Sequence, residues 1–166
     1  MIREATKTDY NAIAHLQISS WRSAYRDILT EDFLGKPVYD EIMGRWTEHI
    51  PEANDVLLVH QGDYGVDGFI NVLAETPALI DNLHISPRIY RNGTATALMR
   101  AAASRLIENG QNSARLKVIT SNTPAAQFYL KLGGERGAEK HEHLYGQRVT
   151  TVEMTWRDLT GLARGV

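Results

Sequence analysis

The spacing of apolar residues changes at Val56, and this change constrains the fold more than any other feature of the sequence. Before it, Ile13, Leu16 and Trp21 fall roughly on one face of a helical pattern that runs to about Tyr25. After it, short apolar runs typical of strands alternate with helical segments that end at glycine. We predict strands at residues 56–59, 69–73, 79–85, 116–119 and 149–156, and helices at residues 38–49, 93–109 and 124–132. This order predicts a mixed α/β sandwich.

Length and composition limit the class of protein. The 166 residues suffice for one domain, predicted to span residues 1–166, and a hydrophobic content of 43% can fill a core. A net charge of -2 argues against a protein that coats nucleic acid. The absence of cysteine excludes disulfides, thiolate metal sites and a cysteine nucleophile. The charged start is unlike a signal peptide, and no apolar stretch reaches the ~18 residues of a membrane span. We therefore expect a cytoplasmic protein that does not associate with membranes.

The segment with the clearest chemical content is residues 80–96. A predicted strand ends at Pro87, and a short loop leads through Gly93 and Ala95 into a helix. The first backbone N–H groups of a helix have no intrahelical acceptor and attract phosphate oxygens, and small side chains leave them accessible. The loop lacks the residues of a Walker loop and the three glycines of a dinucleotide fingerprint. It indicates a phosphate site or, alternatively, a tight turn that needs small residues for packing.

Three motifs resemble those of the GCN5-related N-acetyltransferase (GNAT) family. The family's loop, Arg/Gln-x-x-Gly-x-Gly/Ala, falls on residues 90–95, where Gly93 and Ala95 match and Tyr90 replaces Arg or Gln. The family's Asn-x-x-Ala-x-x-Phe-Tyr-x-x-x-Gly pattern resembles residues 122–133, and residues 21–34 resemble the substrate-side helices of many bacterial members. The resemblance implies the GNAT fold, a mixed, mostly antiparallel central sheet flanked by helices. It also implies N-acetyltransferase activity with acetyl-CoA as co-substrate.

The same resemblance implies which residues hold acetyl-CoA. The loop and first helical turn would bind the pyrophosphate, and a backbone N–H near residues 83–85 would stabilise the oxyanion. Asn122 would bond the pantetheine arm, and its alternative role is a helix N-cap. The implied cofactor-binding residues are Leu83, Ile85, Arg91, Asn92, Gly93, Thr94, Ala95, Thr96, Asn122, Ala125 and Tyr129.

Tyr129 is the candidate general acid. It occupies the position of the family's tyrosine, which implies that its phenol protonates the leaving thiolate. The alternative is that Phe128 and Tyr129 are an aromatic pair of the core. Leu79 and Lys117 stand where other members carry a glutamate base, and with Tyr90 they favour an alternative function, a catalytically degenerate acyl-CoA-binding sensor or partner module.

The general base is left open between Asp81, His84 and ordered water. Histidine has an ordinary pKa of ~6.5, which suits a base, but a lone strand histidine is also a common structural residue. Because side chains alternate along a strand, Asp81 and His84 are expected on opposite faces, with at most one of them facing a given pocket.

The acceptor is expected to be a small-molecule or peptide amine. Trp21 and Tyr25, four residues apart on one helix, either line its pocket or pack on the sheet. No metal is expected, because His141 and His143 have no third ligand at hand. We expect no nucleic-acid partner, and the apolar strand at residues 149–156 could pair across a homodimer.

Overall fold

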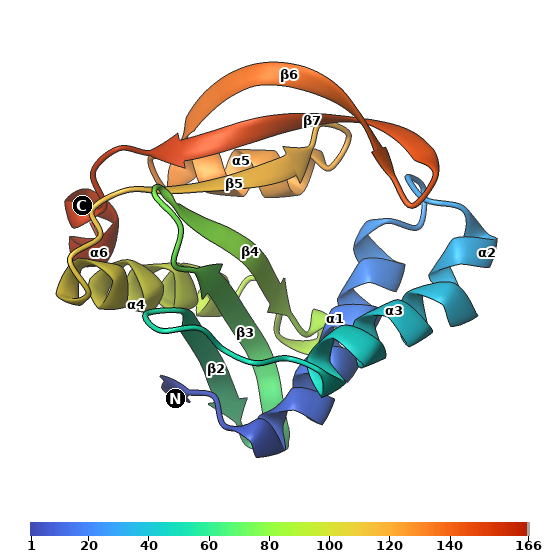
Figure 1. Cartoon of the computed structure of the whole chain (residues 1–166), viewed down its shortest axis with the longest axis horizontal. Helices are drawn as coiled ribbons and strands as arrows, with labels where there is room; N and C mark the ends of the chain where they lie inside the picture. Colours follow the sequence, from blue (N-terminus) through green and yellow to red (C-terminus); the bar gives the residue numbers. More distant parts are fainter. Residues whose placement is uncertain (166) are drawn as a thin grey trace.

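The computed structural model describes residues 1–165 and contains a seven-stranded sheet with helices packed on its faces (Figure 1). The strands are β1 (Ile2–Glu4), β2 (Val56–Gly62), β3 (Gly65–Leu73), β4 (Ala78–Ile85), β5 (Ala114–Ile119), β6 (Glu135–Leu144) and β7 (Gln147–Trp156). The α-helices are α1 (Tyr10–Ala24), α2 (Glu31–Leu34), α3 (Lys36–Thr47), α4 (Thr94–Glu108), α5 (Thr123–Lys131) and α6 (Thr160–Arg164). Two 3₁₀ helices, η1 (Lys7–Asp9) and η2 (Pro87–Ile89), precede α1 and α4.

The sheet has the order β1-β2-β3-β4-β5-β7-β6. Its neighbouring strands are antiparallel except for β4 and β5, which are parallel. The predicted mixed, mostly antiparallel sheet flanked by helices is therefore confirmed, and each predicted strand and helix is present within a few residues of its expected bounds.

Two hydrophobic clusters cover opposite faces of the sheet. Leu58 and Ile70 belong to a cluster with α4, whereas the adjacent Val59 and Phe69 belong to a cluster with α1 and α3. This division follows from strand geometry, because successive side chains point to opposite faces. Figure 1 accordingly shows α4 and α6 on one side of the strands and α1 to α3 on the other.

Strand β6 was not predicted, and it changes the expected role of β7. Along β6 most side chains are exposed and many are charged, so it has no alternating apolar pattern to reveal it. Because β6 forms the edge, β7 is paired on both sides, with β5 and with β6. The expectation that residues 149–156 could pair across a dimer is therefore wrong, while a homodimer by another surface stays a prediction.

Within residues 1–165, no helix is long and apolar enough to cross a membrane.

Candidate active site

The central sheet opens between β4 and β5. These strands pair only where they begin, with Ala78 opposite Ala114 and Leu79 opposite Arg115, and then diverge (Figure 1). A cleft of about 160 Å³ lies at this opening, with α1 and α5 forming its other walls. Predicted site residues in or next to three elements, α1, β4 and α5, line it, namely Trp21, Tyr25, Asp81, Leu83, His84, Asn122, Ala125 and Tyr129. Of the remaining predicted residues, Ile85 is buried in the cluster with α4, and those of the loop lie at the start of α4.

A β-bulge in β4 places Asp81 in the cleft. Asn71 of β3 lies opposite Asn82, but the next residue, Val72, lies opposite Ile80, so Asp81 is one extra residue on β4. Such an extra residue breaks the alternation of side chains. Asp81 and His84 line the same cleft, and the expectation that at most one of them would do so is wrong.

Asp81 ends a chain of hydrogen bonds that begins in the core beneath α1 and α3. The indole Nε1 of Trp46 donates to Gln17 Oε1 (2.7 Å), and Gln17 Nε2 donates to Asn82 Oδ1 (2.9 Å). Asn82 Nδ2 then donates to Asp81 Oδ2 (2.6 Å), which also accepts a bond from Arg45 Nη2 (3.3 Å). Gln17 and Asn82 are buried, yet each finds a partner for both its amide oxygen and its amide nitrogen.

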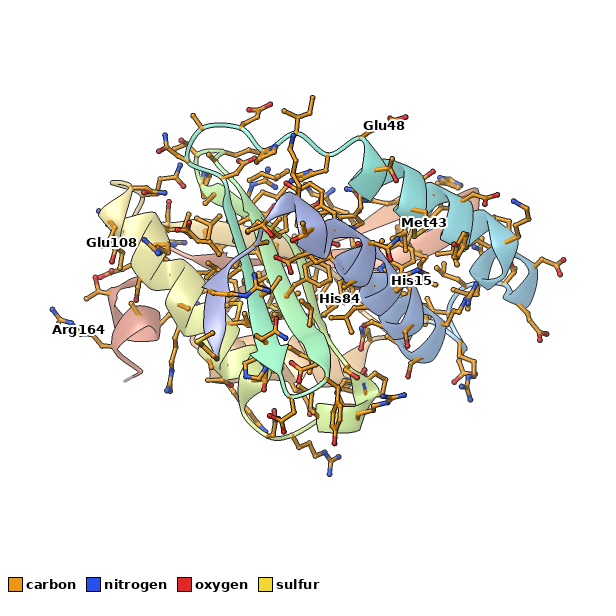
Figure 2. All side chains as sticks on the ribbon, turned by 90° about the horizontal axis from the view of Figure 1, so that it is seen from below. His15, Met43, Glu48, His84, Glu108 and Arg164 are labelled. Atoms are coloured by element: carbon orange, nitrogen blue, oxygen red, sulfur yellow. The ribbon has the colours of Figure 1, made fainter. Side chains whose placement is uncertain are left out.

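His84 lies deeper in the same wall. Figure 2 shows it near the middle of the molecule beside α1, where its Nδ1 is 2.8 Å from Ser20 Oγ. Burial lowers the pKa of His84 to about 4, so the imidazole is neutral at pH 7. A neutral imidazole with this low proton affinity has no charge to attract an ammonium group. The carboxylate of Asp81 does have such a charge.

The depressed pKa of His84 predicts a pH-dependent stability. An unfolded histidine binds a proton below pH ~6.5, whereas the folded His84 binds one only near pH 4, so stability falls as the pH drops through this window. We expect wild type to lose at most about 3 kcal/mol more than a His84→Asn variant between pH 6.5 and pH 4. Urea unfolding at several pH values measures the difference, and parallel profiles for the two proteins would contradict it.

Tyr129 lies both in the hydrophobic core and at the cleft, the environments expected for its two alternative roles. Its ring packs on the core beside Phe128 and Trp156, and it also lines the cleft. Burial, with a smaller contribution from Tyr25, raises the pKa of the Tyr129 phenol well above its usual range. The phenol therefore keeps its proton at physiological pH, as a general acid must.

Trp21 and Tyr25, which line the cleft, belong to a larger cluster of aromatic side chains. Trp21 lies edge-on to Tyr25, with ring centroids 5.0 Å apart, and to Tyr145, 5.8 Å away. Tyr145, from the turn between β6 and β7, also stacks on Phe33 of α2 at 4.4 Å. The contribution of Tyr145 was not predicted, because it depends on the unpredicted strand β6.

The predicted phosphate loop precedes α4, a helix of 15 residues. Gly93 has a φ of 85°, which a side chain would strain, and a Cβ built there would meet no atom within 4 Å. Asn92 Oδ1 accepts from the backbone nitrogen of Thr94 (3.0 Å) and from its hydroxyl (2.7 Å). The next N–H groups, of Ala95 and Thr96, belong to the first turn of α4 and have no intrahelical acceptor.

Asn122 stands at the N-cap position of α5, as its alternative role required. Within the described chain, however, its side chain makes no capping bond, and it lines the cleft instead. This leaves its amide available for a ligand.

The described residues 1–165 contain no group of three or more His, Cys, Asp or Glu side chains placed to hold a metal ion. His141 Nδ1 lies 3.1 Å from Thr150 Oγ1, and Glu142 accepts bonds from Lys117 (2.7 Å) and Thr151 (2.6 Å).

Comparison with known proteins identifies a family and a fold. Residues 15–134 match the model of the acetyltransferase (GNAT) family. An uncharacterized N-acetyltransferase of Bacillus subtilis, YuaI, is 28% identical over 165 residues, which cover 97% of this chain and 95% of that protein. A GCN5-related N-acetyltransferase from Rhodopseudomonas palustris has a similar structure, with a TM-score of 0.76, 16% identity and 93% of each chain covered. The PaiA N-acetyltransferase from Thermoplasma acidophilum, solved with coenzyme A, has a TM-score of 0.70 and 19% identity over 94% of this chain and 98% of that one.

Proposed function

The chain belongs to the acetyltransferase (GNAT) family, and from this premise we propose that it transfers the acetyl group of acetyl-CoA to a primary amine. The amine attacks the acetyl group directly while both substrates are bound. The observation that carries the proposal is the opening between β4 and β5, where a carboxylate and a protonated phenol line one cleft, together with the glycine-led start of α4, the helix that follows β4 along the chain.

Acetyl-CoA fits the features along β4 and α4. The free N–H groups of Ala95 and Thr96 suit its pyrophosphate, and the exposed Arg91 adds positive charge. The edge of β4 that faces β5 is unpaired beyond Leu79, so Leu83 and Ile85 offer backbone groups to the amide-bearing pantetheine arm. The coenzyme A bound to the similar PaiA protein supports this assignment.

The acceptor amine enters from the side of α1 and α2. Trp21, against which Tyr145 packs, and Tyr25 provide an apolar wall, and Asp81 provides the negative charge that attracts an ammonium group. An amine with a hydrophobic body suits this combination.

The chemistry requires proton transfers that Asp81 and Tyr129 supply. Acetyl-CoA brings an activated carbonyl and a good leaving group, so forming the C–N bond and breaking the C–S bond needs no covalent enzyme intermediate. Two protons leave the nitrogen in total. Asp81 accepts the first proton from the ammonium group and passes it to solvent. Tyr129 donates its phenol proton to the leaving sulfur and regains the second proton from the acetylated nitrogen through water.

The test is release of free CoA thiol from acetyl-CoA in the presence of a panel of amines with aliphatic or aromatic bodies. We expect at least one amine to accelerate release and to appear as its acetyl derivative in the mass spectrum. If acetyl-CoA binds but no amine accelerates release, the alternative of a degenerate acyl-CoA-binding module replaces the enzyme.

A further inference from the structure

The hydrogen-bond chain that ends at Asp81 has only one possible direction. An indole N–H can only donate, so Trp46 requires the oxygen of the Gln17 amide. The Gln17 nitrogen is then turned to Asn82 and requires the oxygen of that amide, which turns the Asn82 nitrogen to Asp81. The donor-only indole thus fixes the orientation of two buried amides and presents an N–H to a carboxylate, which can only accept.

The hydrogen-bond chain contacts only one oxygen of the Asp81 carboxylate. Both Asn82 and Arg45 donate to Oδ2 of Asp81, and no donor from residues 1–165 is bonded to Oδ1. One oxygen is therefore held by the protein, and the other is left for a ligand in the cleft that Asp81 lines.

We propose that Trp46, Gln17 and Asn82 are positioning residues that hold the Asp81 carboxylate in place to receive the acceptor amine. This inference rests on the proposed function, in which Asp81 binds the ammonium group and accepts its proton. The bulge at Asp81 leaves that carboxylate without a fixed place in the strand alternation, and the bond from Asn82 provides one.

A purely structural role does not account for this arrangement. Buried amides are costly unless fully bonded, and apolar residues would fill the space between α1, α3 and β4 at lower cost. Here the buried amides connect to one another, and the chain leaves the core only at the carboxylate in the cleft. The donor-to-acceptor direction of these hydrogen bonds, and not the packing of the side chains, connects the core to the Asp81 carboxylate.

The experiment reverses the direction without changing the shape. In Gln17→Glu the ionised carboxylate can only accept, so it takes the Asn82 nitrogen and turns the Asn82 oxygen toward Asp81. A protonated carboxyl would instead donate and keep the original direction, so the kinetics are measured up to pH ~9. We expect kcat/KM for the amine to fall by about tenfold or more, with the KM for acetyl-CoA unchanged. Asn82→Leu also removes the donor to Asp81 and serves as a second variant if Gln17→Glu does not fold.

The matched control is Asn71→Asp. Asn71 is a buried amide opposite Asn82 on β3, and its Oδ1 has no hydrogen-bond partner among the described residues. The substitution adds a buried acid beside the chain without reversing any of its bonds. We expect it to lower thermal stability as Gln17→Glu does but to leave kcat/KM within about threefold of wild type.

A double-mutant cycle with Asp81→Asn decides the outcome. If Gln17 acts through Asp81, adding Gln17→Glu to Asp81→Asn costs no further activity. Full additivity, or wild-type activity in folded Gln17→Glu and Asn82→Leu, overturns the positioning role while leaving the proposed function intact. Wild-type activity in Asp81→Asn overturns the role of Asp81 and the inference together.

Discussion

Tyr129→Phe is expected to lower kcat by about 10²- to 10³-fold while the KM for acetyl-CoA changes by less than about twofold. The substitution removes one hydroxyl and keeps the ring that packs beside Phe128 and Trp156. Burial raises the pKa of the phenol, so wild type carries the proton throughout the neutral range and the variant lacks it at every pH. Steady-state kinetics with varied acetyl-CoA and varied amine separate the two effects.

Tyr10→Phe is the control for that measurement. Tyr10 also packs among aromatic rings, Trp46 and His49, but it does not line the cleft. Removing its hydroxyl should leave kcat unchanged. A kcat for Tyr129→Phe equal to that of Tyr10→Phe would remove Tyr129 from the mechanism.

Asp81→Asn is expected to lower kcat/KM for the amine by about 10²-fold at pH 7. The amide keeps the shape of the side chain but neither attracts an ammonium group nor accepts its proton. Because a primary amine with a pKa near ~10.4 loses its proton in solution as the pH rises, the deficit should shrink at alkaline pH. The ratio of variant to wild-type kcat/KM from pH 7 to pH 10 measures this recovery.

The control for Asp81→Asn is Asp40→Asn. Asp40 pairs with Lys36 on the exposed surface of α3, so this variant makes the same change in net charge away from the cleft. It should keep wild-type kinetics at every pH. A deficit in Asp81→Asn that stays constant from pH 7 to pH 10 would contradict proton transfer to Asp81.

The sequence predicted those parts of the fold in which apolar residues are buried. Strands β2 and β3 are covered on both faces and have the dense apolar runs that indicate strands. Strand β6 is an exposed edge, and its charged residues give no periodic signal. Its absence from the prediction also led to the wrong expectation for β7.

The candidate site was predictable where a motif specified it. Asn122, Ala125 and Tyr129 lie on one short segment, and the structure brings them to the cleft together. Arg45 and Tyr145 join the site through contacts between distant segments, which no local pattern encodes.

Gln17 and the bulge at Asp81 differ in what the sequence could have revealed. Gln17 shares the buried face of α1 with Ile13, Leu16 and Ser20, at helical spacing. A polar side chain on such a face indicates a buried hydrogen-bond partner, so this signal was available. The bulge depends on the register between β3 and β4, and neither strand carries a glycine there to mark it.

Calorimetric titration of the purified protein with acetyl-CoA is the most direct test of whether this chain binds the proposed co-substrate. We expect binding in the micromolar range with about one site per chain, through the loop before α4 and the free edge of β4. A Gly93→Val variant, which strains the positive φ and fills the open space before the helix, should lose most of that affinity. No heat of binding to wild type at high micromolar acetyl-CoA would overturn the proposed function, because the chain would then keep the fold of the family without its co-substrate.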